Sequence, residues 1–137
     1  MRFTIITPEK TILDTETNGV FVRAIDGELG ILPNHIPLMT ALDIGVATYI
    51  KQDGTKDYVS VLGGIFKVEN NEVTILTKAA ELSEDIDEIK AKEAADRAKA
   101  ELQRAIDTSG DKYSAEVEKA RLAFMKAMSR LKTARKN

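Results

Sequence analysis

The stretch AELSEDIDEIKAKEAADR, residues 80–97, marks a change in the character of the chain. Up to about Leu76, short segments alternate apolar and polar residues and are rich in Val, Ile, Thr and aromatic residues, which is typical of strands. From Asp85 onward Gly and Pro disappear except for Gly110, and Ala, Glu, Lys, Arg and Leu dominate, which favours helices. The sequence therefore predicts a β domain over residues 1–84, followed by an α domain over residues 85–137.

The segments before this stretch predict the strands of a β-sandwich or flattened barrel. They read RFTII, GVFVRAI, VATYI, DYVSVLG and EVTIL. Turn signals separate them at residues 18–19 (Asn-Gly), 53–54 (Asp-Gly) and 70–71 (Asn-Asn), because these residue types accept the positive φ of tight hairpins. The glycine pair at 63–64 predicts either a strand bulge, which is favoured, or a close approach of another backbone.

Two helices are expected to form an antiparallel hairpin. Asp85 and Glu88 have the spacing of a capping box, so the first helix should begin near Ile86, and TSGD at residues 108–111 should form the turn. The apolar faces consist of Ile86, Ile89, Ala94, Ala98, Leu102 and Ala105 in the first helix and of Val117, Ala120, Phe124, Met128 and Leu131 in the second. Because alanine buries little apolar area, these faces predict either a detachable hairpin or an ordinary helical cap on the sandwich.

Composition excludes several classes of site. The chain of 137 residues has no cysteine, so it has no disulfide, thiol nucleophile or thiolate metal site, and a reducing compartment is expected. No apolar run approaches the roughly 20 residues that cross a bilayer, so any membrane association should go through a partner protein. The N-terminal segment lacks the features of a signal peptide.

Charge is distributed unevenly along the chain. Residues 1–85 carry 7 basic and 13 acidic side chains, whereas residues 86–137 carry 13 basic and 9 acidic ones, with no acid after Glu118. A basic helix can bind nucleic acid. That interpretation is disfavoured because the cations alternate with apolar residues and the rest of the chain is acidic.

The segment GELGILPNHIPLMTAL, residues 27–42, contains two of the three prolines and the only histidine. Pro33 and Pro37 each remove a backbone donor and fix φ, so the segment is expected to be a shaped loop rather than a central strand. His35 is better explained as an interface or structural residue than as a general base, because no cysteine is present and the serines are distant in sequence. No catalytic residue is therefore expected.

This segment, the paired glycine in VSVLGGIFKVENNEVTIL and the AAELSEDID that opens an alanine-rich hairpin resemble, in this order, the ε subunit of the F-type ATP synthase. The resemblance covers essentially the whole chain. It implies a non-catalytic rotor subunit of a proton- or sodium-translocating complex, located peripherally on the cytoplasmic face of a bacterial membrane. The sandwich would couple the γ shaft to the membrane c-ring, with Glu28 and His35 in the region of rotor contact.

The resemblance also implies that the helical hairpin inhibits ATP hydrolysis. In the inhibitory state the hairpin would open, and the second helix would reach the α and β subunits. The basic face expected to meet acidic surface there consists of Lys119, Arg121, Lys126 and Arg130. Binding of nucleic acid and direct binding of a membrane are not expected.

The acids around Asp87 fit a helix N-terminus, where the macrodipole favours them. The family resemblance adds a regulatory ATP site, since relatives that bind ATP carry an Ile-Asp-x-x-Arg-Ala pattern here. The residues implied are Glu81, Ile86, Asp87, Lys90, Ala91, Arg97, Lys126 and Arg130. Lys90 and Lys126 stand where arginines would be expected, and lysine lacks the planar fork that binds phosphate in a bidentate way, so weak ATP binding is predicted.

Neither a P-loop nor a cluster of metal ligands is apparent in the sequence, so this site would bind nucleotide without hydrolysing it. No cofactor is required, and ATP would be a regulatory ligand. An alternative is a stand-alone ATP-binding sensor module that has lost the rotor role. Binding of γ would distinguish the two hypotheses.

Overall fold

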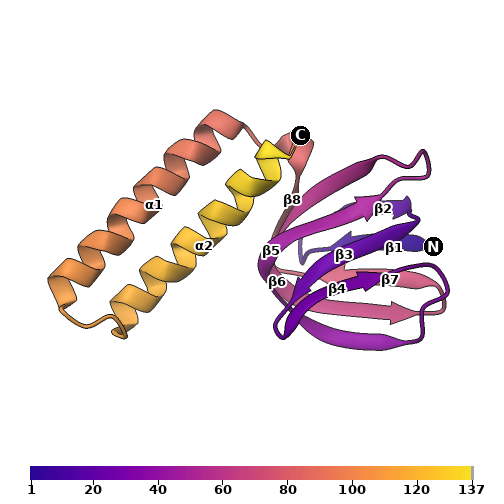
Figure 1. Cartoon of the computed structure of the whole chain (residues 1–137), viewed down its shortest axis with the longest axis horizontal. Coiled ribbons are helices and arrows are strands. Elements are labelled where there is room, and N and C mark those ends of the chain that lie inside the picture. The colour runs from indigo at the N-terminus through magenta and orange to yellow at the C-terminus, as the bar shows by residue number, and fades with distance from the viewer. Residues whose placement is uncertain (137) are drawn as a thin grey trace.

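The computed structural model describes residues 1–136 and places a β-sandwich beside a two-helix hairpin (Figure 1). The strands are β1 (Arg2–Ile6), β2 (Thr11–Glu16), β3 (Gly19–Ala24), β4 (Gly27–Ile31), β5 (Leu38–Ile50), β6 (Lys56–Glu69), β7 (Glu72–Leu76) and β8 (Ala80–Leu82). A short 3₁₀ turn (Ser83–Asp85) leads to α1 (Glu88–Ser109) and α2 (Ala115–Arg135). The expected fold class, a β-sandwich followed by an antiparallel helical hairpin, is confirmed.

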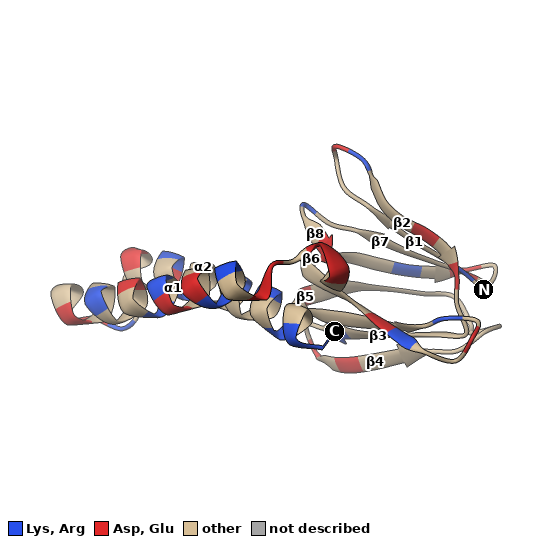
Figure 2. Cartoon of the chain, turned by 90° about the horizontal axis from the view of Figure 1, so that it is seen from above, with Lys and Arg blue, Asp and Glu red and all other residues tan. Residues whose placement is uncertain are grey.

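The strands form one continuous sheet in the order β2-β1-β7-β6-β5-β3-β4, with β8 paired to β6. Neighbouring strands are antiparallel except β1 and β7, which are parallel. The long strands β5 and β6 take part in both layers of the sandwich, which are separated in Figure 2. Alternating residues of the strands face inward, as in β1, where Phe3 and Ile5 are buried and their neighbours are not.

The proline-containing segment is less of a loop than expected. Residues 27–31 form the edge strand β4, residues 38–42 begin β5, and only residues 32–37 connect them. Both prolines lie inside this connection. Because proline has no backbone N–H to donate to a neighbouring strand, neither β4 nor β5 extends across them. The expected loop over the whole of residues 27–42 is therefore wrong at both ends.

The turn signals correspond to different local structures. Asn70 and Asn71 both have positive φ and join β6 to β7 as a two-residue hairpin, as predicted. Gly54 also has positive φ, in the connection between β5 and β6. Asn18-Gly19 is not a hairpin turn, because β2 pairs with β1 while β3 pairs with β4 and β5.

The paired glycine marks a close approach of two backbones. Gly64 has φ +127°, and a Cβ there would collide with the carbonyl oxygen of Leu76 in β7. The register between β5 and β6 is the same on both sides of the pair, with Leu42 opposite Gly64 and Ile44 opposite Leu62. The favoured bulge is therefore wrong, and the alternative of a close backbone approach is correct.

The first helix begins two residues later than expected. Asp87 is the N-cap of α1, and its carboxylate accepts a hydrogen bond from the backbone N–H of Lys90 at 3.1 Å. Asp85 instead ends the 3₁₀ turn, so the predicted capping box is wrong. At the other end, Gly110 in the left-handed conformation caps α1 within the predicted turn.

The apolar face of α2 is close to the predicted one, whereas the buried residues of α1 are Ala91 and Ala95, neither of which was predicted. Ala91, Ala95, Leu131 and Ala134 cluster with Ile86, whereas Ile89 is exposed on α1. The buried cluster of the sandwich is separate and draws its residues from the strands alone. In Figure 1, α2 lies between α1 and the sandwich, so it is the helix that connects the two parts. Within residues 1–136 neither helix is long and apolar enough to span a membrane.

Candidate functional site

An ion pair joins the sandwich to α2 at the seam between the two parts. The guanidinium of Arg130 donates from Nε to Oε1 of Glu81 at 2.6 Å and from Nη2 to Oε2 at 3.1 Å. Both side chains are more than a third exposed, so solvent screens the pair and its net contribution to stability is small. The bidentate geometry nevertheless fixes the orientation of Arg130 toward β8.

A pocket of about 250 Å³ lies beside this ion pair. The sandwich contributes Ser60 and Glu81 to its lining, α1 contributes Ala94, and α2 contributes Lys126 and Arg130. The pocket therefore brings together three of the eight residues expected at the nucleotide site. Its volume is below the roughly 300–1,000 Å³ that is usual for small-molecule sites, so in this conformation it has room for part of a nucleotide.

The other five residues lie elsewhere around the hairpin. Ile86 and Ala91 are buried in the helical cluster, where their side chains support the hairpin. The carboxylate of Asp87 caps α1, while the side chains of Lys90 and Arg97 are exposed on the same helix. The N-capping role of Asp87 follows from the helix boundary, which sequence reasoning placed too early.

The basic face of α2 is only partly free of interactions. Arg121 lies 3.4 Å from Glu118 and donates to the carbonyl oxygen of Lys112 at 3.3 Å. Arg130 is held by Glu81. Lys119 and Lys126 are exposed, and the ribbon of the hairpin is blue at many positions in Figure 2, which marks its Lys and Arg residues. Lys119 and Lys126 are therefore the members of this face that a partner could reach with the least rearrangement.

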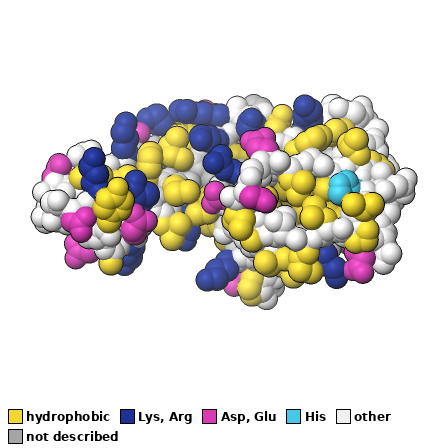
Figure 3. Space-filling model, turned by 60° about the horizontal axis from the view of Figure 1, so that its bottom comes forward, with side chains coloured by type: hydrophobic (Ala, Val, Ile, Leu, Met, Phe, Trp, Pro, Cys, Tyr) yellow, Lys and Arg dark blue, Asp and Glu magenta, His cyan; other side chains and the backbone are white. Residues whose placement is uncertain are grey.

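The connection between β4 and β5 presents apolar side chains to solvent. Leu32 and Ile36 are exposed within it, and Met39 is exposed at the start of β5. Figure 3 shows apolar side chains around the single histidine of the chain. These apolar residues were missed by sequence reasoning, although apolar residues beside two prolines in a connection are a usable signal of a docking surface.

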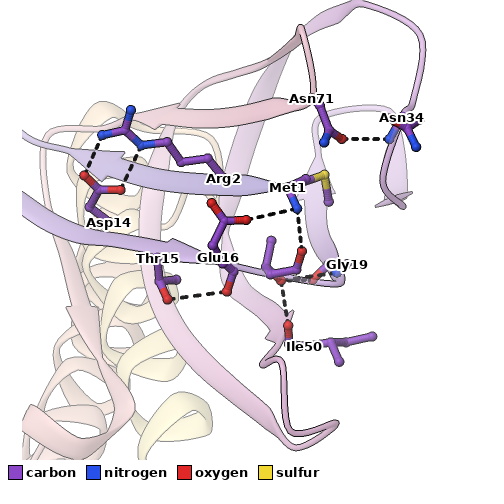
Figure 4. A network of polar contacts seen from close by, with 10 residues as sticks. Met1, Arg2, Asp14, Thr15, Glu16, Gly19, Asn34, Ile50 and Asn71 are labelled. Carbon is purple, nitrogen blue, oxygen red and sulfur yellow. Dashed lines mark hydrogen bonds and ion pairs between the residues drawn. The ribbon is translucent and has the colours of Figure 1, made fainter.

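This connection is anchored to the rest of the sandwich. The backbone N–H of Asn34, which has φ 66°, donates to the side-chain oxygen of Asn71 at 2.8 Å (Figure 4). Asn71 lies in the hairpin between β6 and β7, so two turns that are distant in sequence support one another. His35 is half-buried, and its Nδ1 lies 2.7 Å from the carbonyl oxygen of Ile36.

Glu28 and His35 lie on different surfaces of the sandwich. Glu28 is on β4 opposite Arg23 and lines a groove of about 580 Å³ between the sandwich and α2. His35 lies beyond the other end of β4, in the connection to β5. The structure therefore does not bring the two proposed rotor-contact residues together. No cluster of His, Cys, Asp and Glu suited to a metal ion occurs among residues 1–136.

Comparisons with known proteins identify the same family for both parts of the chain. Residues 1–83 match the family model of the β-sandwich domain of the ATP synthase delta/epsilon chain, and residues 84–135 match that of its long α-helix domain. The ATP synthase epsilon chain of Symbiobacterium thermophilum is 44% identical, covering 98% of this chain and 92% of that protein. The epsilon chain of Halalkalibacterium halodurans is 39% identical, covering 95% and 93%.

Solved structures agree with these sequence matches. The structure resembles a chain in a cryo-EM structure of the Euglena gracilis mitochondrial ATP synthase, OSCP/F1/c-ring, with a TM-score of 0.76 and 26% identity over 93% of this chain and 76% of that chain. A chain in the central stalk/c-ring structure of the Tetrahymena thermophila mitochondrial ATP synthase matches with a TM-score of 0.52, 16% identity and coverage of 62% and 68%. At that identity the second match concerns the fold alone.

Proposed function

Because the chain belongs to the ATP synthase delta/epsilon chain family, we propose that its sandwich joins the γ shaft to the c-ring and that its hairpin restrains ATP hydrolysis. The chain is a non-catalytic stalk subunit of a membrane-associated complex. In this proposal it sits on the cytoplasmic face of a bacterial membrane, and it reaches the membrane only through the complex.

The anchored apolar connection carries the rotor-contact part of the proposal. Leu32, Ile36 and Met39 present apolar area on a segment that two prolines and the Asn34–Asn71 hydrogen bond hold in shape. A segment that is already ordered loses little conformational entropy on docking, so more of the contact energy becomes affinity. His35 belongs to this surface, whereas Glu28 would contact a partner that lies along β4.

The test replaces one exposed isoleucine by a charged residue in the connection between β4 and β5 and, separately, one near the start of α1. Ile36 is 75% exposed in the connection, and Ile89 is 73% exposed on α1, so Ile36→Glu and Ile89→Glu impose the same change on equally accessible side chains. We expect Ile36→Glu to weaken co-purification with γ and the c-ring, while Ile89→Glu leaves it unchanged. Equal retention of both variants would contradict the assigned contact surface.

The regulatory part of the proposal concerns the hairpin and ATP. Lys126 and Arg130 line the seam pocket with Glu81, so a phosphate group entering it would meet two cations contributed by α2. A ligand that also contacts the sandwich and α1 would favour the docked hairpin, because it stabilises only the conformation in which those surfaces meet. ATP is therefore proposed as a regulatory ligand, with weak affinity because Lys90 and Lys126 replace arginines and Arg130 is already paired.

A further inference from the structure

The hairpin and the sandwich share a buried polar contact at the centre of their interface. The hydroxyl of Ser129, on α2, donates to the carbonyl oxygen of Gly45 in β5 at 3.0 Å, and it lies 2.9 Å from the hydroxyl of Ser60 in β6. Ser129 and Ser60 are 5% and 3% exposed. These groups come from three different elements and meet where α2 crosses the sandwich.

The direction of these hydrogen bonds follows from the number of protons. A hydroxyl has one proton to donate and two lone pairs that accept. Since Ser129 donates to Gly45, Ser60 must donate to Ser129. The result is a directed chain from Ser60 through Ser129 to Gly45, in which the hydroxyl of Ser129 is needed by both neighbours.

The sheet is irregular at the point where it meets the helix. Strands β3 and β5 pair at Phe21 with Thr48 and again at Ala24 with Leu42, and the pairing between these two points is irregular. Gly45 lies inside this interruption, and its carbonyl oxygen accepts from α2. The irregularity of the sheet therefore supplies an acceptor that the helix uses.

The buried apolar residues of the sandwich and of the hairpin do not form a shared core. The buried cluster of the sandwich and the alanine-rich cluster of the hairpin contain no residue in common. The Glu81–Arg130 ion pair is exposed and therefore screened. Thr133, one turn beyond Ser129, is buried as well and donates to the carbonyl oxygen of Ser129 within the helix at 2.8 Å. Ser129 is thus a buried residue of α2 whose side chain makes hydrogen bonds to the sandwich.

We propose that Ser60, Ser129 and the carbonyl of Gly45 form a hydroxyl latch that holds the hairpin on the sandwich. The three groups are hydrogen-bonded to one another only in the docked conformation, and loss of one of them there leaves a neighbour buried without its partner, which is strongly disfavoured. When α2 leaves, all three groups become free to bind water. The latch therefore favours the docked hairpin in the absence of any ligand, an inference that rests on the proposed release of the hairpin.

The test is amide hydrogen exchange of the full chain in the variants Ser129→Ala and Ser60→Ala. Without its contacts to the sandwich the alanine-rich hairpin is marginal, so exchange in the C-terminal half of α2 reports undocking. We expect each variant to accelerate that exchange about two- to tenfold, the factor that corresponds to one lost hydrogen bond. Exchange in β1 and β7 should be unchanged.

Helix propensity predicts the opposite sign for Ser129→Ala, since alanine is the better helix former and would slow exchange. Ser60→Ala leaves the helix sequence untouched, so it decides the question if Ser129→Ala fails to fold. The double variant should exceed the faster single variant by less than about threefold, because both substitutions break the same chain of hydrogen bonds. Ser109→Ala, at an exposed hydroxyl of the last residue of α1, is the matched control and should leave α2 unchanged.

Unchanged or slower exchange of α2 in Ser60→Ala would overturn the latch. Equal acceleration in α2 and β7 would overturn it as well, since that result would mean that the hydroxyl supports the sandwich rather than the docking. Fully additive effects in the double variant would show that the two hydroxyls act separately, which also contradicts the proposal.

Discussion

The sandwich and the hairpin are stabilised in different ways. Phe3, Phe66 and Ile75 are fully buried between the layers of the sandwich, together with branched residues from several strands. The hairpin buries alanines around Ile86 and Leu131. Since a fully buried Phe or Leu side chain contributes about 1.5–3 kcal/mol and alanine far less, the sandwich has an independent core, whereas the hairpin depends on docking. The proposed division into a fixed part and a releasable part rests on this difference.

The largest expected effect comes from removing a ring from the sandwich. Phe66→Ala should lower the free energy of unfolding by about 3–5 kcal/mol, because it leaves a cavity among fully buried residues. Leu131→Ala in the hairpin should cost less, about 2 kcal/mol, because a thinly packed cluster collapses around the gap more easily. Residue-resolved urea unfolding by NMR distinguishes the two. Loss of the sandwich signals in Leu131→Ala would contradict the separation of the two parts.

The second prediction concerns the basic face in the assembled enzyme. Changing Lys119, Arg121 and Lys126 to alanine should raise ATP hydrolysis severalfold, because it removes cations that would meet acidic catalytic-subunit surface. Arg130 is left in place, since its loss would also break the ion pair with Glu81.

The matched control for this variant is the replacement of three exposed cations of α1, namely Lys92, Lys99 and Arg104. It should leave hydrolysis nearly unchanged. If the α1 and α2 variants raise hydrolysis equally after incorporation has been verified, the effect belongs to net charge and not to the face of α2.

The third prediction tests the seam between the two parts. ATP should bind the isolated chain weakly, and Lys90→Arg and Lys126→Arg should each raise affinity about five- to tenfold, because a recovered bidentate contact is worth about 1 to 1.5 kcal/mol. Isothermal titration of the wild type, both single variants and the pair measures this. Tight ATP binding by the wild type, or no gain in affinity from either arginine substitution, would show that the two lysines do not weaken the ATP site.

The smallest effect is a dependence on alkaline pH within the sandwich. Burial raises the pKa of Tyr49 to about 12, and its hydroxyl also donates to Asp57 at 3.3 Å. The unfolded chain releases this proton near pH 10, so the stability contributed by Tyr49 is complete below pH 10 and is lost as pH rises toward 12. Tyr49→Phe should flatten the fall of the unfolding free energy over that interval. An identical pH slope in both proteins would contradict the assigned pKa.

The order and type of the elements could be predicted because the sequence patterns are strong. Apolar and polar residues alternate in strands such as β7, and alanine-rich composition with helical spacing marks the two helices. The helix start could not be predicted, since Asp85 and Asp87 are both acceptable N-caps and only the buried position of Ile86 selects between them. The proline prediction failed at the flanks of the connection, because residues 27–31 pair with β3 and residues 38–42 pair with β6, so both flanks are strands. Tertiary pairing decided each of these cases.

The candidate sites show the same limit. Glu81 and Arg130 are 49 residues apart in sequence, and their bidentate contact depends on how α2 docks. Ser60 and Ser129 carry no signal in sequence, because a serine within a strand or helix is usually solvated. The contacts that join the sandwich to the hairpin can therefore be identified only in the folded structure and not from the sequence.

Co-purification of residues 1–84 with γ tests the central claim most directly, namely that the sandwich is the fixed rotor-coupling part and the hairpin is releasable. The fragment contains every strand and the anchored connection between β4 and β5. The account predicts that it folds cooperatively and is retained by γ as well as the full chain is. A fragment that fails to fold, or that folds and is not retained, would contradict it.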